Sequence, residues 1–236
     1  MNDQRFLWTF VAITTAVVLL NIWLVQRAYA RRTHTRTHLK AALGGGVILG
    51  GWMFLHWALA NAGVLLGPPD EVPPRALPYL ALTTAAVVAL GCSPVGRTLA
   101  HHLSWPALIG MQGFRVPLEV WLHRMWTQGH IPQQMTWAGW NLDVLSGIGA
   151  IALAVLMMRG HARRFVMAWN ILGLGLLGVV VCVAILSAPT PLKQFDGPAL
   201  TLVFEAPFNW IASVLVMTAL LGHILVFRKL AHEALS

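Results

Sequence analysis

Four polar residues in the stretch 103–125 are spaced so that they share one face of a helix. Gln112, Arg115, Glu119 and His123 follow one another at intervals of three, four and four, and at about 100° per residue they line one side. Arg115 and Glu119 can pair at this spacing, and Arg115 can also hold an anionic group. Charges inside a membrane cost at least about 2.5–3.5 kcal/mol each, so they usually serve a function or a buried pairing.

Further polar residues occur in three other apolar stretches, in positions that predict the outer half of a helical bundle. Glu205 and Asn209 are four residues apart, Asn141 and Asp143 begin another stretch, and His56 lies near the end of an earlier one. The candidate ligand-binding residues are Arg115, Glu119, His123, Gln112, Asn141, Asp143, Glu205, Asn209 and His56. Two interpretations remain open: an outward-facing polar pocket, or hydrogen bonding that only holds the helices together.

No sequence motif assigns catalytic residues or a cofactor. The motifs GxSxG, HExxH and CxxC do not occur, and we expect neither a metal site nor a cofactor. One alternative is a haem, since His56 and His123 have similar predicted depths and could be its axial ligands. The catalytic residues, if there are any, stay unknown.

The elements that must position these residues are membrane-spanning helices. Of the 236 residues, 57% are hydrophobic and 10% are charged, whereas soluble domains carry about 25% charged residues. Seven apolar stretches come near the roughly 20 residues that a bilayer requires. They cover residues 6–26, 41–66, 77–92, 103–125, 140–158, 165–186 and 202–227. We predict an all-α integral membrane bundle of seven transmembrane helices, forming a single domain over residues 1–236.

The basic residues predict how this bundle is oriented. Eleven of the 16 Lys and Arg residues lie in the first, third and fifth loops and in the C-terminal tail, and three lie on the other side. Positive charge favours the cytoplasmic side, so the N-terminus is expected outside and the C-terminus in the cytoplasm. The net charge of +8 is explained in this way, and nucleic acid is not an expected partner. We expect the bacterial inner membrane as the location.

Two comparisons with known families can be made from the residues. The stretch 202–227 contains no lysine, which excludes the retinal Schiff base of microbial rhodopsins, and Lys229 is predicted beyond its end. From residue 112 onward, the chain resembles a family of uncharacterised bacterial multi-pass inner-membrane proteins. The resemblance rests on Gln112-Gly113-Phe114-Arg115, Glu119, Leu122-His123, Met135-Thr136, Gly139, Asn141, Asp143, Trp169-Asn170, Ser187-Ala188-Pro189-Thr190-Pro191 and Phe195. It implies a membrane location and no particular activity.

The sequence therefore predicts a polytopic membrane protein that binds, transports or senses a small ligand in an outward-facing polar pocket. Transport is disfavoured because we expect no inverted repeat and no clearly broken helix. An intramembrane enzyme, or a haem- or metal-binding redox protein, is one alternative. A structural or assembly subunit of a membrane complex is another. The expected partners are the lipid bilayer and a small molecule, and the oligomeric state is left open.

Overall fold

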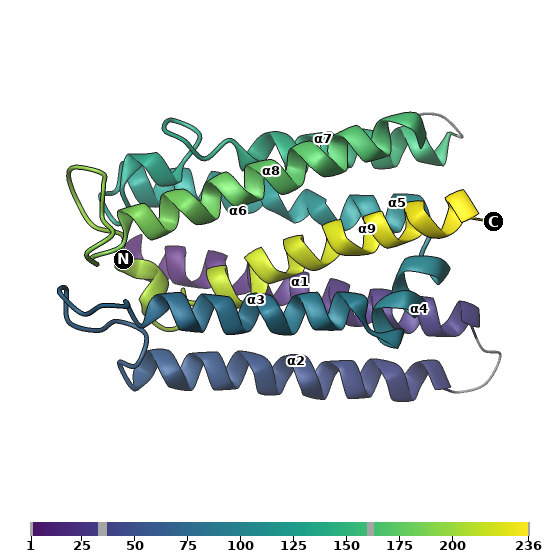
Figure 1. Ribbon diagram of the computed structural model, residues 1–236, viewed down its shortest axis with the longest axis horizontal. Coiled ribbons are helices and arrows are strands. Elements are labelled where there is room, and N and C mark those ends of the chain that lie inside the picture. Colours follow the sequence, from purple (N-terminus) through teal and green to yellow (C-terminus); the bar gives the residue numbers. More distant parts are fainter. Residues whose placement is uncertain (1, 33–36, 160–162, 236) are drawn as a thin grey trace.

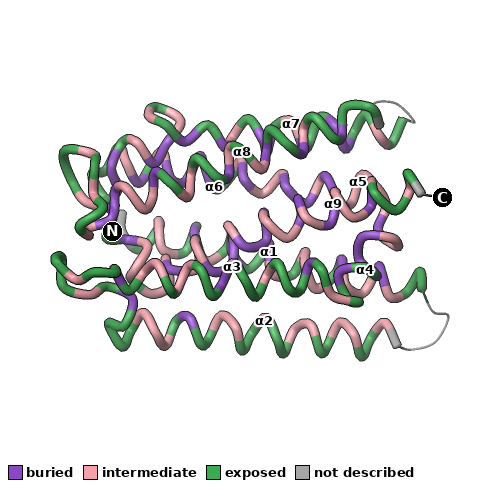
Figure 2. Tube along the Cα trace, viewed as in Figure 1, coloured by how far each residue is buried: buried purple, intermediate pink, exposed green. Residues whose placement is uncertain are grey.

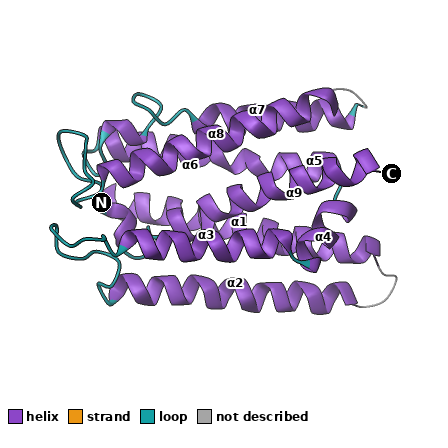
Figure 3. Ribbon diagram, in the orientation of Figure 1, coloured by secondary structure: helices purple, strands orange, loops and turns teal. Residues whose placement is uncertain are grey.

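The regular structure of the chain is helical throughout its described parts (Figure 3). The computed structural model describes residues 2–32, 37–159 and 163–235. The helices run along the long axis of the molecule, and the two termini lie at opposite ends of it (Figure 1). The prediction of an all-helical protein is confirmed for these residues.

Four helices in the described ranges are long and apolar enough to cross a membrane. They are α1 (Asn2–Arg32), α2 (Thr37–Asn61), α8 (Arg163–Ser187), and a segment in which the π-helix η4 (Ile211–Val216) continues directly into α9 (Met217–Leu235). Each contains at least 24 residues that satisfy the length and hydropathy requirements, which exceeds the roughly 20 needed for a span.

A fifth candidate span is bent in the middle. α3 (Ala76–Cys92) and α4 (Pro94–His102) meet at an angle of 61°. Ser93 ends the first helix and caps the second, because its hydroxyl accepts a hydrogen bond from the amide of Gly96 at 3.2 Å. Pro94 has no amide hydrogen and suits the first position of the new helix. The pair is thus one broken span or a re-entrant loop, and α3 ends where the predicted stretch 77–92 ends.

The stretch predicted at 103–125 is a continuous helical segment built in three parts. α5 (Trp105–Gly110), the 3-10 turn η1 (Met111–Phe114) and α6 (Arg115–Thr127) follow without a gap. α7 (Asp143–Met158) is apolar but has only 16 residues. By length and composition, four to five helices can cross a membrane, and seven crossings stay a prediction.

The segment before α7 is mostly non-helical and packs partly into the interior. It contains η2 (Gln133–Met135) and buries Thr136 and Asn141. The carbonyl of Thr136 accepts hydrogen bonds from the amides of Gly139 and Asn141, at 2.9 and 3.2 Å. The buried part of this non-helical segment therefore has paired backbone groups, whereas Trp140 is 65% exposed.

The outermost helix, α2, carries a large apolar surface that no other part of the described chain covers. Most of α2 is exposed or half-buried in Figure 2, and Leu43, Val47, Ile48 and Phe54 are each at least 67% exposed. Soluble monomers rarely expose such continuous apolar surface. The surface of α2 therefore suits contact with lipid.

The interior consists of two apolar clusters with polar residues between them. One cluster includes Leu108, Ile109 and Leu225, and the other includes Trp121 and Leu215. Buried Arg115 lies along the chain between Met111 of the first cluster and Leu118 of the second. Buried His223 likewise lies between Leu215 of the second cluster and Leu225 of the first. Arg115 and His223 thus lie where the two apolar clusters meet along the chain.

α9 is longer than predicted, and its last turns hold the ends of two other helices. Arg228 donates hydrogen bonds to the carbonyls of Gly91 and Ser93 at the end of α3. Lys229 lies inside the helix, not beyond its end, and its Nζ donates to the carbonyls of Ala100 and Leu103 at 3.2 and 2.9 Å. These carbonyls belong to helix C-termini, which lack internal partners and attract cations.

Candidate functional site

A buried ion pair joins α6 to α7 at the centre of the polar interior. Nη1 of Arg115 lies 2.6 Å from Oδ1 of Asp143, with 1% and 7% of the two side chains exposed. Asp143 is the first residue of α7, where the positive end of the helix dipole stabilises a carboxylate. Each charge thus has a direct partner of opposite sign, and the carboxylate of Asp143 is also stabilised by the start of α7.

The same guanidinium also contacts α7, α8 and α9. Nη1 donates to Oγ of Ser146 at 2.8 Å and to the carbonyl of Gly173 at 3.5 Å. Nη2 lies 2.9 Å from Nε2 of His223. Because Arg115 can only donate, Nε2 must be the acceptor, which places the ring proton of a neutral His223 on Nδ1.

His223 connects the guanidinium to α8. Its Nδ1 lies 2.8 Å from Oδ1 of Asn170, which is the acceptor that the assigned tautomer requires. Nδ2 of Asn170 donates back to the carbonyl of His223 at 3.2 Å. The result is a reciprocal clamp between α8 and α9, and neither residue was among the predicted site residues.

Glu119 has a different partner from the one that its spacing suggested. Both of its carboxylate oxygens lie 2.9 Å from Nδ2 of Asn141, which also donates to the carbonyl of Met135 at 3.0 Å. Oδ1 of Asn141 accepts from the amide of Asp143 at 3.1 Å. In place of the expected pair of Arg115 with Glu119, Arg115 pairs with Asp143 and Glu119 accepts from Asn141.

These contacts form one continuous hydrogen-bonded chain, which we call the charged network. Its members come from α6, α7, α8, α9 and the segment before α7. They are Arg115, Glu119, Asn141, Asp143, Ser146, Asn170 and His223, and each is buried. With His223 neutral, the network holds one guanidinium and two carboxyl groups. Glu119 is the carboxyl group without a cation in direct contact among the described side chains.

Gln112 lies on the same segment but outside the charged network. Its Nε2 donates to the carbonyl of Ala219 at 2.9 Å, and Oε1 has no partner in the described structure. A side chain at Gly222 would overlap the Gln112 amide, so this glycine permits the close contact between η1 and α9.

A second polar group, which we call the His56 network, joins α2, α3 and η4. Nδ1 of His56 lies 2.7 Å from the hydroxyl of Tyr79, and Asn209 donates to the carbonyl of His56 at 2.6 Å. The indole of Trp52 donates to the carbonyl of Ser213 at 2.9 Å. Nε2 of His56 and Oδ1 of Asn209 are buried with no partner in the described structure.

Three predicted site residues join neither network: Gln112, as described above, Glu205 and His123. Glu205 is exposed, in the turn between η3 (Leu202–Phe204) and η4. His123 is half-buried, and its ring stacks on Trp137 with centroids 4.2 Å apart. The predicted site is therefore divided: His56 and Asn209 belong to one network, and Arg115, Glu119, Asn141 and Asp143 to the other.

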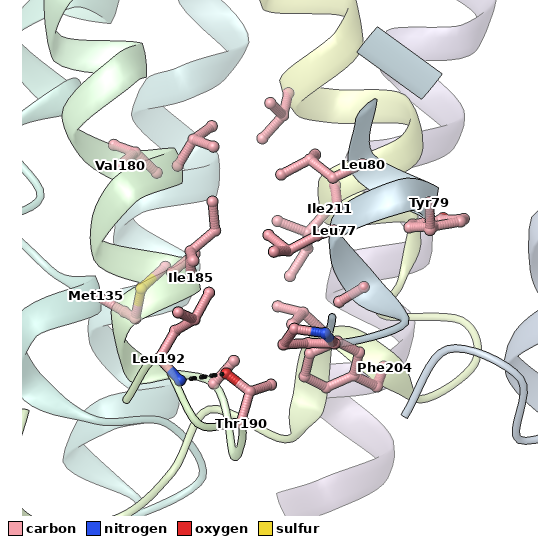
Figure 4. A pocket seen from close by; sticks show the side chains of 18 residues that line it. Leu77, Tyr79, Leu80, Met135, Val180, Ile185, Thr190, Leu192, Phe204 and Ile211 are labelled. Carbon is pink, nitrogen blue, oxygen red and sulfur yellow. Dashed lines mark hydrogen bonds between the residues drawn. The ribbon is translucent and has the colours of Figure 1, made fainter. Parts of the chain in front are cut away.

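An apolar cleft opens between α3 and α8, with η4 behind it (Figure 4). Val180 and Ile185 line one side of it and Leu77 and Leu80 the other (Figure 4). Its empty volume is about 820 Å³ including the open side, and its lining is mostly apolar, as in most ligand pockets. We refer to it as the α3–α8 cleft.

The cleft borders both polar networks. Tyr79, which bonds to His56, and Met135, whose carbonyl accepts from Asn141, are among its lining residues. At its rim, Thr190 and Phe204 also line a smaller hollow that includes Arg75. Arg75 forms an exposed ion pair with Glu71 at 2.8 Å. The cleft is thus apolar inside and polar at its rim.

Neither a metal centre nor a known relative identifies this site. Within residues 2–32, 37–159 and 163–235, no three His, Cys, Asp or Glu side chains are grouped as metal ligands would be. No protein-family model, curated protein or solved structure matches the chain.

Proposed function

We propose that this chain is a multi-pass inner-membrane protein that binds a small amphiphilic ligand in the α3–α8 cleft. The observation that supports this function best is the cleft itself, which is apolar inside and has polar residues at its rim. The apolar part of a ligand would lie between Leu77, Leu80 and Val180. Its polar end would lie at the rim, near Thr190 and the Arg75–Glu71 ion pair.

In this proposal, the charged network holds the helices around the cleft. Arg115 was expected to hold an anionic group of the ligand, but it already has Asp143 as an anion and three further partners. Nη1 and Nη2 of this buried guanidinium would have to break these contacts before they could bind a ligand, whereas Nε has no partner in the described structure. We therefore assign ligand contact to the cleft and helix positioning to Arg115.

We further propose the topology of seven crossings with the N-terminus outside. The position of the termini at opposite ends of the molecule supports an odd number of crossings (Figure 1). The excess of basic residues in the loops on one side supports a cytoplasmic C-terminus. The α3–α8 cleft would then lie in the outer half of the membrane.

The cleft is tested by filling it. Ala184 lines the cleft from α8, whereas Val179 lies on the same helix, is 42% exposed and is not a lining residue. Wild-type protein, Ala184→Trp and Val179→Trp would be purified in the same detergent, and the compounds that co-purify would be extracted and quantified by mass spectrometry. A compound retained by wild type and Val179→Trp but lost from Ala184→Trp supports the proposal. Equal retention in all three variants contradicts it.

The two alternative functions are tested on the same preparations. A haem held by His56 and His123 would give a Soret band in the visible absorption spectrum. A structural subunit would co-purify with a stoichiometric partner protein.

A further inference from the structure

A second hollow, unrelated to the α3–α8 cleft, lies between α1 and α6. It consists of two adjoining cavities that share Ile13 and Pro117, with empty volumes of about 1260 and 740 Å³ including their open sides. We refer to it as the α1–α6 groove. Its lining residues are Arg5, Phe6, Thr9, Ala12, Ile13, Ala16, Val17, Leu20, Phe114, Val116, Pro117, Val120, Trp121, Arg124 and Gln128.

One end of this groove is cationic. Arg5 on α1 and Arg124 on α6 both line it there, together with Thr9 and Gln128. Neither guanidinium has a hydrogen bond or an ion pair with any side chain in the parts of the chain that the structure describes, and none of the lining residues is acidic. Two guanidinium groups without an anion thus lie beside the same groove.

The remainder of the groove is apolar and has the length of about one lipid leaflet. From Thr9 to Leu20, α1 rises roughly 17 Å at 1.5 Å per residue, which is a little over half of the roughly 30 Å hydrocarbon core of a bilayer. Ala12 and Ala16 on α1 and Pro117 on α6 are small or short residues on facing helices. Their size leaves the space that a branched side chain would fill.

The cationic end is held in place by buried contacts. The indole of Trp121 donates to the carbonyl of Phe6 at 3.0 Å, and Phe10 packs on the Trp121 ring with centroids 5.0 Å apart. These contacts connect the first turns of α1 to α6. Arg5 precedes Phe6, and Arg124 follows Trp121 by three residues, so the two guanidinium groups flank this contact.

We propose that the α1–α6 groove binds an anionic phospholipid. Its phosphate would lie between Arg5 and Arg124, since guanidinium groups bind phosphate oxygens through paired hydrogen bonds. One acyl chain would extend along Ile13, Val17 and Leu20 toward the middle of the membrane. This site is independent of the ligand proposed for the α3–α8 cleft, so either proposal can fail without the other.

The charge requirement is tested by native mass spectrometry of the full chain in detergent. Wild type and Arg5→Gln/Arg124→Gln would be titrated with phosphatidylglycerol and, separately, with phosphatidylcholine. Loss of two arginines near a lipid headgroup should weaken phosphatidylglycerol binding by about thirtyfold and change phosphatidylcholine binding little. Arg97→Gln is the control, because Arg97 is exposed on α4 and lines neither groove nor cleft.

The chain requirement is tested by a variant that keeps both arginines. Ala16→Trp places a large ring in the groove, whereas Leu19→Trp changes a residue on α1 that is 60% exposed and outside the groove. Ala16→Trp should lose phosphatidylglycerol and Leu19→Trp should retain it. The proposal is overturned if the double arginine variant binds phosphatidylglycerol like wild type, if Ala16→Trp does so, or if millimolar inorganic phosphate displaces the lipid.

Discussion

Replacing Arg115 with methionine should destabilise the protein strongly, because it leaves Asp143 buried without its cation. At the 2.6 Å separation of Nη1 and Oδ1, the attraction is about 6 kcal/mol for an effective dielectric constant near 20. Desolvation of both groups offsets much of this in the intact pair. Removing one partner, however, leaves the cost of burying the other, and such variants lose about 3–5 kcal/mol of unfolding free energy.

The measurement is thermal unfolding in detergent, followed by the intrinsic fluorescence of the 11 tryptophans. For a chain of this size, a loss of 3–5 kcal/mol corresponds to a decrease in Tm of about 6–20 °C. Arg97→Met is the matched control, because Arg97 is exposed and has no side-chain partner in the described structure. Its Tm should change by less than about 2 °C.

A double variant separates the ion pair from simple loss of packing. Arg115→Met/Asp143→Asn removes both charges and should be more stable than Arg115→Met alone, since no uncompensated charge remains. If Arg115→Met unfolds within 2 °C of Arg97→Met, the pair contributes no stability. If the loss of unfolding free energy in the double variant equals the sum of the losses in the two single variants, the two residues act independently. That result would refute the reasoning.

Three further predictions follow from the packing and the topology. Gly173→Ala should lower the unfolding free energy by about 1–3 kcal/mol, because a Cβ there would lie 2.6 Å from Oγ of Ser146. Gly175→Ala is the control and should leave the unfolding free energy unchanged, because open space surrounds Gly175. Equal Tm values for the two variants would contradict the packing argument. Lys229→Met should lower the unfolding free energy by about 1–3 kcal/mol, measured by chemical or thermal unfolding, because it leaves carbonyls at the end of α4 unpaired. An unchanged Tm would show that water replaces the ammonium group as their partner. In a background with both native cysteines replaced by serine, a membrane-impermeant maleimide added to intact cells should label Asp70→Cys and not Arg97→Cys, and the reverse pattern would invert the topology.

The sequence predicts the helical class from composition, and it singles out Arg115, Glu119, Asn141 and Asp143 from their types and spacing, but not their partners. The shared face of Arg115 and Glu119 depends only on the rotation per residue. Their partners depend on where α7 begins, and that boundary is set by tertiary contacts of the preceding segment. A helix starting at 140 would carry Asn141 and Asp143 on different faces, whereas the observed start places both against α6.

The remaining differences arise where helices deviate from regular geometry. The last stretch was predicted to end at residue 227, whereas α9 extends to Leu235. Glu205 was placed on that helix at a spacing of four from Asn209, although the chain turns before η4. Ser93-Pro94 was a local signal of the bend between α3 and α4, but hydropathy alone did not reveal it.

The π-helical turn η4 has a consequence for the register of the polypeptide at the α3–α8 cleft. A π-turn contains about one residue more than an α-turn. If Ile211–Val216 rewound into α geometry, every residue before it would rotate by about 100° and shift by roughly 1.5 Å relative to α9. Asn209 would then move away from His56, and the carbonyl of Ser213 from Trp52. The two hydrogen bonds between α2 and the segment 209–213 therefore stabilise the π-helical register against the α-helical one.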